Sequence, residues 1–309
     1  MSKLLRFASF ILLVVLLVAV YLFLVRPGQL VWGATAEEIA RPLPGDDLVA
    51  DPTFDATRAI TIDASPEQIW PWLVQWGYGR AGFYGYDLVE NIGSPSGLRS
   101  ADRLIPAYQQ LAVGDTVKMN DFYDFKVRAI EPNRYIVLAG DVDPAIGSMT
   151  WSLAPIDANH TRLIHRFHMR YQWDKPDIAV LLFTDVADHV ALRKIMQGIK
   201  DRVEGRAEPL LVQGFELGVY LLIVVEFIVA SVLIFTHRKW ALVWLLALIA
   251  GLTVLFALYA PAPLLLKAFV ALGIGRVLIL LVRRVDNPQA GQRSGGEEPE
   301  LEPVGPSTA

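Results

Sequence analysis

The chain has 309 residues, of which 53% are hydrophobic and 19% are charged, and its mean hydropathy is +0.38. This composition is too apolar for one ordinary soluble domain and indicates an integral membrane protein. A formal net charge of −4 gives no general attraction to nucleic acid, so we predict no nucleic-acid partner. Cysteine is absent, which excludes disulfides, thiolate metal sites and a cysteine nucleophile.

The first apolar run covers residues 7–25, within a predicted N-terminal anchor of residues 1–26. At about 1.5 Å per residue it can cross a hydrocarbon core of about 30 Å. A cleaved signal peptide is the alternative, because residues 34–36 (Ala-Thr-Ala) have the form of a cleavage site. We favour a retained anchor, since the run exceeds a signal core of about 7 to 15 residues. Residues 27–54 predict a connector with one helical turn near residues 36–40.

A globular domain is predicted over residues 55–206, opening with a strand at residues 57–62. Ser65 and Pro66 then suit the start of a helix that ends near Gly77. A second helix is predicted over residues 81–92, with aromatic, carboxylate and amide groups on one side. Such a helix suits the wall of a partly polar cavity.

The loop at residues 93–110 is a candidate lid or cavity entrance. After it, period-two alternation predicts an antiparallel sheet, with strands at residues 113–119, 122–130, 135–138, 148–153 and 161–171. In the last strand Leu163, His165 and Phe167 share one face, while arginines share the other. The pattern predicts an apolar concave face and a wet, basic outer face. The amphipathic segment at residues 176–204 predicts a long helix that covers the apolar face.

Three runs of sequence carry a resemblance to a known family: ASPEQIWPWLVQWG (64–77), GRAGFYGYD (79–87) and LAVGD (111–115). They resemble the polyketide cyclase/START-like (SRPBCC) superfamily, and most closely its uncharacterised membrane-anchored members. The resemblance covers about residues 57–206. It implies an α+β helix-grip fold with a hydrophobic ligand cavity, and it does not imply a reaction.

Eight residues are predicted to bind the ligand of that cavity: Tyr84, Tyr86, Asp87, Asn91, Met149, Trp151, His165 and Phe167. His165 is the only histidine expected on the cavity face, and with Asp87 or Tyr86 nearby it can serve as a general base. The more common role for such a residue is a hydrogen-bonded wall group.

Asp185, Asp188 and His189 can share one face of the predicted long helix. We interpret them as an exposed acidic patch in preference to a metal site, and we predict neither a metal nor a cofactor.

The C-terminal third, residues 211–284, contains three further predicted spans at residues 211–235, 240–259 and 264–282. Basic residues flank the spans at Lys3, Arg6, Arg238, Lys239, Arg283 and Arg284. The positive-inside rule then predicts both chain ends in the cytoplasm and the globular domain on the other side of the membrane, which we predict to be the plasma membrane. Residues 285–309, rich in Gly, Pro and Glu, predict a disordered tail.

Four charged residues fall inside these spans: Glu216, Glu226, Lys267 and Arg276. Each costs roughly 2.5 to 3.5 kcal/mol near the bilayer centre when unpaired. Their depths predict two ion pairs, Glu216 with Lys267 and Glu226 with Arg276. For the shallower pair, snorkelling to the interface is the alternative.

Three classes of function fit these observations. The favoured class is a membrane-anchored protein that binds a lipid or another hydrophobic small molecule in the helix-grip cavity. The second is an enzyme of the cyclase/dehydrase kind acting on a hydrophobic substrate, with His165, Asp87, Tyr84 and Tyr86 as polar groups. The third is a structural or assembly role for the transmembrane helices.

Overall fold

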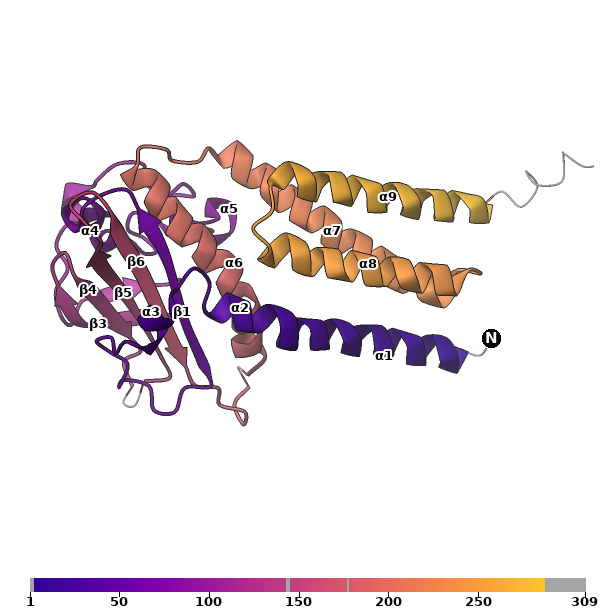
Figure 1. The fold of residues 1–309 in the computed structure, drawn as a ribbon, viewed down its shortest axis with the longest axis horizontal. Helices are drawn as coiled ribbons and strands as arrows, with labels where there is room; N and C mark the ends of the chain where they lie inside the picture. Colours follow the sequence, from indigo (N-terminus) through magenta and orange to yellow (C-terminus); the bar gives the residue numbers. More distant parts are fainter. Residues whose placement is uncertain (1–2, 143–144, 177, 287–309) are drawn as a thin grey trace, which may run out of the picture.

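The computed structural model describes residues 3–142, 145–176 and 178–286. It shows a domain built on an antiparallel sheet at one end and long helices that run away from it at the other (Figure 1). Of the predicted tail, residues 285 and 286 belong to the last helix, and residues 287–309 lie outside the described residues.

The sheet has six strands in the order β1-β6-β5-β4-β3-β2, and all neighbouring strands are antiparallel. The strands are β1 (Phe54–Ile62), β2 (Thr116–Lys118), β3 (Asp124–Glu131), β4 (Tyr135–Ala139), β5 (Gly147–Pro155) and β6 (Thr161–Met169). They confirm the strand predictions, with ends that differ by a few residues. An open sheet of this kind with helices on it is consistent with a helix-grip fold.

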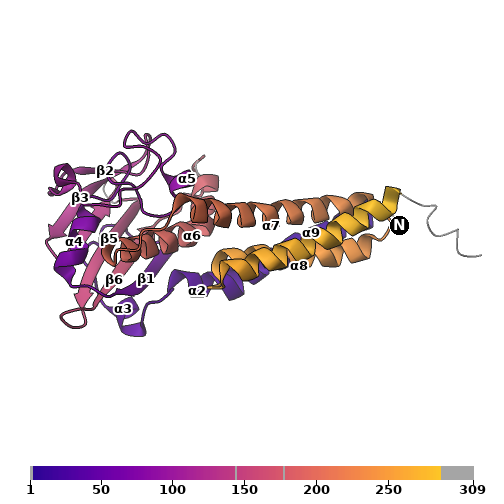
Figure 2. The same cartoon turned by 90° about the horizontal axis from the view of Figure 1, so that it is seen from above.

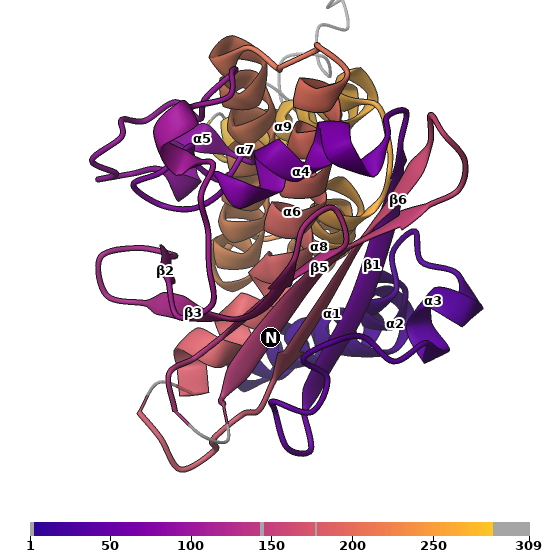
Figure 3. The ribbon, with the colours of Figure 1, turned by 90° about the vertical axis from the view of Figure 1, so that its left-hand side faces the viewer.

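The long helix α6 (Ile178–Val203) covers one face of the sheet, and Figure 3 shows it behind the strands with the long helices beyond it. The register opposes Trp151 to His165, so both side chains stand on this inner face. The buried residues of α6 on this side are Leu192, Ile195, Met196 and Ile199. The inner face is therefore the apolar one, as its alternation predicts.

The outer face of the sheet differs from the prediction, because it is covered and not wet. Arg166 is only 6% exposed. Its guanidinium donates to the carbonyls of Glu38 and Ile39 and pairs with Asp46 at 2.6 Å. Thr150 donates to the carbonyl of Pro44 in the same way. The connector thus lies over this face, and its backbone carbonyls satisfy the buried polar side chains.

The connector contains two short helices, α2 (Arg26–Leu30) and α3 (Ala36–Ala40). The second confirms the predicted turn, and a capping box between Thr35 and Glu38 starts it. The first was not predicted, because residues 26–30 continue the N-terminal span as a helix.

The aromatic-rich stretch forms only one of its two predicted helices. Helix α4 (Pro66–Val74) begins at a capping box between Ser65 and Gln68. The second prediction was wrong, since only one turn, α5 (Asp87–Glu90), is helical. Gly82 and Tyr84 adopt left-handed backbone angles, with φ of 84° and 69°, and such angles interrupt a right-handed helix.

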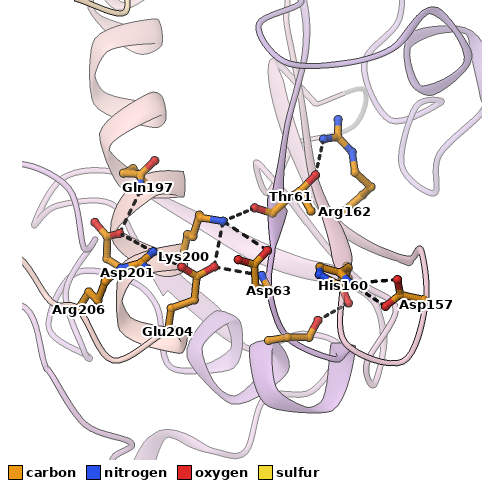
Figure 4. A network of polar contacts seen from close by, with 12 residues as sticks. Thr61, Asp63, Asp157, His160, Arg162, Gln197, Lys200, Asp201, Glu204 and Arg206 are labelled. Carbon is orange, nitrogen blue, oxygen red and sulfur yellow. Dashed lines mark hydrogen bonds and ion pairs between the residues drawn. The ribbon is translucent and has the colours of Figure 1, made fainter. Parts of the chain in front are cut away.

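Polar contacts fasten the C-terminal end of α6 to the end of β1 (Figure 4). Lys200 donates to the carbonyl of Thr61 at 2.7 Å and pairs with Glu204 at 2.9 Å. Glu204 in turn accepts from the backbone N–H of Asp63 at 3.0 Å. The helix is therefore held in register against the strand that it crosses.

Four helices are long and apolar enough to cross a membrane. The first joins α1 (Lys3–Val20), the π-helical segment η1 (Tyr21–Val25) and α2, and the others are α7 (Leu210–Thr236), α8 (Trp240–Tyr259) and α9 (Leu264–Asp286). They run side by side away from the sheet (Figure 2). Arg6 donates to the carbonyl of Phe235 at 2.7 Å and Trp244 to that of Ser9 at 2.7 Å, which ties α1 to α7 and α8.

The charged residues of the spans do not form the predicted pairs. Glu216 pairs at 2.7 Å with Lys194 of α6, outside the spans. It also accepts from the hydroxyl of Tyr220, which accepts from Lys267 at 3.1 Å, so Glu216 and Lys267 meet only through this tyrosine.

The second predicted pair fails for a geometric reason. Glu226 is 4% exposed, and neither of its carboxyl oxygens has a hydrogen-bond partner among the described residues. Gly275 lies against it, because a Cβ at Gly275 would stand 2.6 Å from the nearer oxygen. Arg276, one residue further round α9, is exposed. Equal depth in the membrane therefore did not determine which side of the helix faces Glu226.

We expect Gly198→Ala to destabilise the domain. A Cβ at Gly198 would lie 1.8 Å from the carbonyl oxygen of Tyr84, so α6 and the aromatic stretch would have to separate. Overpacking of this kind costs roughly 1 to 3 kcal/mol. Elsewhere in a helix the same change stabilises by about 0.5 to 1 kcal/mol.

Thermal unfolding in detergent micelles, followed by circular dichroism, measures this effect. The control is Gly218→Ala in α7, where a Cβ meets no atom within 4 Å. A melting temperature for Gly198→Ala at or above that of the wild type would contradict the close contact.

Candidate functional site

A cavity of about 240 Å³ lies between the inner face of the sheet and α6. Strands β5 and β6 form one wall, α6 forms the opposite wall, and the aromatic stretch closes one side. The lining residues are Trp76, Phe83, Glu90, Met119, Met149, Trp151, His165, Phe167, Asp188, Ala191, Leu192 and Ile195. The site is therefore aromatic and apolar, with a few polar groups.

Half of the predicted ligand-binding residues line this cavity. They are the four from the sheet: Met149, Trp151, His165 and Phe167. Strand alternation placed them on the correct face, because successive side chains of a strand point to opposite sides. Ligand binding by them stays a prediction.

The other four predicted residues lie elsewhere, because the helix expected over residues 81–92 does not form. The hydroxyl of Tyr84 contacts Gln75 at 2.9 Å, and Tyr86 packs edge-on against Tyr220 of α7. Asp87 accepts hydrogen bonds from Asn91 at 3.1 Å and from Ser100 at 2.5 Å.

This buried cluster joins the domain to the spans and does not line the cavity. The backbone N–H of Asp87 donates to Gln213 of α7 at 3.0 Å. Neither Asp87 nor Tyr86 therefore stands beside His165 as an acid–base partner. The loop at residues 93–110 does not line the cavity either, and it packs on α6 where Arg202 donates to the carbonyl of Ala101.

Glu90 is one of the cavity residues that were not predicted as site residues. Both of its carboxyl oxygens are buried without a side-chain partner among the described residues, and only the backbone of Gly85 and Tyr86 lies close to them. Burial raises the pKa of Glu90 to about 7, and the charge of Asp87 acts in the same direction. The sequence did contain a signal for Glu90, because a carboxylate within a stretch of aromatic residues indicates a buried ionisable group.

His165 is 2% exposed, and its ring centroid lies 4.3 Å from that of Trp151. Nδ1 of His165 and Nε1 of Trp151 are both buried without a partner among the described residues. Burial lowers the pKa of His165 to about 3, and the positive charge of Arg58 contributes. The imidazole is therefore neutral near pH 7, and it is a weak base for proton transfer.

Asp188 reaches the cavity as part of a buried ion pair with Arg58 of β1. Asp185, one turn earlier on α6, accepts from Arg26 at 2.9 Å and from the hydroxyl of Tyr171 at 2.5 Å. His189 is buried. The exposed acidic patch expected here is thus absent, because arginines from other elements pair with both carboxylates.

A larger hollow of about 630 Å³ lies on the outside of the domain, between the connector, Asn133 and the end of β5. None of the described polar atoms that are buried without a partner belongs to its lining. The cavity between the sheet and α6 has three such residues, Glu90, Trp151 and His165, and is the better candidate site.

No family model and no curated protein matches the chain. Solved structures similar to it include a conserved protein of unknown function from Enterococcus faecalis, which is 14% identical, covers 53% of this chain and 82% of its own, and has a TM-score of 0.31. The self-sacrificing resistance protein CalC from Micromonospora echinospora is 12% identical. The match covers 50% of this chain and 97% of CalC, with a TM-score of 0.29. A polyketide cyclase-like protein from Corynebacterium glutamicum is 17% identical. The match covers 54% of this chain and 93% of that protein, with a TM-score of 0.23. Similarities at this level establish no function for the chain.

Glu90→Gln is expected to remove a pH dependence of stability. A carboxyl whose pKa rises from 4.5 in the unfolded chain to about 7 in the fold holds its proton more tightly when folded. Its contribution to stability is complete below about pH 4.5 and is lost as the pH rises through about 7. Glutamine stays neutral throughout, so the stability of the variant relative to the wild type should increase by up to about 3 kcal/mol between pH 4.5 and pH 8.

Denaturant unfolding in micelles at the two pH values measures the difference. Glu37→Gln, at an exposed position of α3, is the matched control. A relative stability of Glu90→Gln that is the same at both pH values would show that Glu90 does not bind its proton more tightly in the fold.

Proposed function

We propose that the protein is a membrane-anchored member of the SRPBCC superfamily that binds a small hydrophobic molecule carrying one polar group. The cavity between the sheet and α6 is its binding site. The observation that carries the proposal is the pair of unpartnered nitrogens, Nε1 of Trp151 and Nδ1 of His165, in a largely apolar cavity.

These two nitrogens favour a polar partner that enters with the ligand. Buried polar groups are nearly always hydrogen-bonded, and each unmade bond costs about 1 to 3 kcal/mol. The indole N–H of Trp151 can only donate, whereas Nδ1 of a neutral imidazole donates or accepts according to its tautomer. A ligand hydroxyl or carbonyl oxygen near Trp151 satisfies the donor, and the aromatic walls accommodate the apolar remainder.

The size of the cavity narrows the ligand class. Sites for drug-sized ligands usually measure about 300 to 1,000 Å³. At about 240 Å³ this cavity suits a single ring system or a short chain. It is too small for a phospholipid with two acyl chains, so within the lipid-or-hydrophobic class we propose the smaller members.

Trp151→Phe keeps the ring but removes the donor, and we expect roughly five- to tenfold weaker binding from the loss of one hydrogen bond. Ala191→Phe places a ring in the cavity from α6 and should abolish binding. Ala179→Phe, at the exposed start of the same helix, is the control.

Native mass spectrometry with small-molecule extraction, on protein purified from its own membranes, identifies and counts the bound molecule. The proposal predicts one defined molecule that is retained in the control and lost in Ala191→Phe. Bulk membrane lipid alone, or equal occupancy in all variants, would contradict it.

One observation favours the enzyme as a second candidate. The pKa of Glu90, about 7, suits a group that both gives and takes a proton near neutral pH, and Glu90 faces the same cavity. If Glu90→Gln still captured the molecule that co-purifies, and only the wild type converted it, an acid–base reaction at Glu90 would replace simple binding as the function.

We also propose that the domain lies on the non-cytoplasmic side of the plasma membrane, on the basis of the flanking basic residues. The absence of cysteine makes this testable with single cysteines. In intact cells an impermeant maleimide should label Asn159→Cys, at an exposed turn of the domain, and should not label Thr236→Cys at the far end of α7. The reverse labelling would invert the topology.

A further inference from the structure

A groove of about 380 Å³ lies where the first span and α8 reach the domain. Its lining residues are Val20, Leu24, Val25, Gly28, Gln29, Trp32, His189, Leu252, Leu255, Phe256, Tyr259 and Ala260. Most of them are aliphatic or aromatic and belong to the two candidate spans. The groove is separate from the cavity described above, since no residue lines both.

The first span changes its helix type at this groove. Residues Tyr21–Val25 form a π-helical segment, in which the N–H of Arg26 bonds to the carbonyl of Tyr21. Pro27 follows it, and a proline ring clashes with the carbonyl four residues earlier, which accounts for the wider turn. Segments of this kind recur at functional sites.

The groove stands at the level where hydrocarbon gives way to the polar interface. The first helix runs over 28 residues, Lys3–Leu30, and is therefore about 42 Å long at about 1.5 Å per residue. Since a hydrocarbon core is about 30 Å thick, the helix end beside the domain reaches into the interface. An amphiphile in the groove can keep its chain in the bilayer and its headgroup at the domain.

Two buried polar side chains form the end of the groove nearest the domain. Gln29 is 3% exposed and His189 is 1% exposed. The amide nitrogen of Gln29 donates to the hydroxyl of Tyr21 at 2.7 Å, but its carbonyl oxygen Oε1 has no partner among the described residues, and neither has Nδ1 of His189.

The polar end of the groove is held in place and is electrically neutral. The imidazole of His189 stacks on Tyr259 at 5.7 Å and meets Trp32 edge-on at 6.0 Å. Burial lowers the pKa of His189 to about 3, so the ring is uncharged near pH 7. Of the nearby guanidinium groups, those of Arg26 and Arg58 pair with carboxylates of α6, whereas that of Arg193 donates to the backbone carbonyls of Leu258 and Tyr259.

We propose that this groove binds a neutral membrane lipid with a hydroxyl headgroup, of the monoacylglycerol or long-chain alcohol kind. The hydroxyl donates to Oε1 of Gln29 or to Nδ1 of His189, which is the acceptor nitrogen of the neutral ring because the other nitrogen donates to the backbone carbonyl of Gln29. The acyl chain lies along the aliphatic residues of the first span and α8. This site is additional to the cavity ligand, and it rests on the proposed function only in taking the apolar helices as membrane spans.

The neutral polar end selects against charged headgroups. A phosphate or carboxylate placed there would lose its hydration, and the nearby guanidinium without a carboxylate partner among the described residues, Arg193, already donates to two backbone carbonyls. Such transfers are strongly unfavourable. A hydroxyl loses much less on transfer and brings the donor that Gln29 lacks.

The test uses three diazirine-labelled probes with the same acyl chain in membranes that contain the full-length protein: a 1-acylglycerol, a free fatty acid and a phosphatidylcholine. Photolysis followed by peptide mapping locates the label. We expect the acylglycerol to label residues 20–32 and 252–260, to be competed by unlabelled 1-oleoylglycerol, and to exceed the two charged probes about tenfold.

Gly28→Leu provides a variant that fills the groove. A Cβ at Gly28 meets no atom within 4 Å, so the side chain enters the groove without a clash, and labelling should be lost. Gly273→Leu is the matched control, because it adds the same side chain at an equally open position of α9. Labelling spread evenly along all four spans, equal labelling by the charged probes, or labelling unaffected by Gly28→Leu would each overturn the proposal. If Gly28→Leu does not fold, competition by unlabelled 1-oleoylglycerol on the wild-type protein still tests the proposal, because probe labelling that is not competed would contradict it.

Discussion

The structure depends on one buried charge, the guanidinium of Arg58. Its residue is fully buried on β1, and a buried charge is tolerated only when it is paired and hydrogen-bonded. Its partners come from two other elements, because it donates to the carbonyl of Gln29 in α2 at 2.7 Å and pairs with Asp188 of α6. The first span, the sheet and the gripping helix are therefore held together at one point.

The strands and the long apolar helices were predictable because their signals are local. The alternation over Leu163, His165 and Phe167 indicates which face of β6 is apolar. The hydropathy of a run indicates how long an apolar helix is. The helix expected over residues 81–92 failed because backbone geometry at Gly82 and Tyr84 outweighs a side-chain pattern. That one error displaced Tyr84, Tyr86, Asp87 and Asn91 from the predicted site, while the residues taken from the sheet line the cavity.

The outer face of the sheet and the charges of the spans show a second limit. Alternation marked Arg166 as polar but held no information about the connector whose carbonyls bind it. Their positions along the predicted spans placed Glu226 and Arg276 at the same depth. However, the face of α9 that lies against the carboxyl group of Glu226 carries Gly275 and not Arg276. Glu216 is paired by Lys194, which belongs to a helix outside the spans. In each case the partner is decided by tertiary packing, and a single sequence does not contain that information directly.

The Arg58–Asp188 pair also separates two hollows of different character. Asp188 lines the cavity, whereas Gln29, which accepts from Arg58 through its backbone, lines the groove. Each hollow is small, and each has buried polar atoms without a hydrogen-bond partner among the described residues. Opening the ion pair would leave the guanidinium of Arg58 without a carboxylate partner among the described residues. The two hollows share no lining residue, and each is smaller than a lipid with two acyl chains requires, which is why we propose a small ligand for each in place of one enclosed lipid.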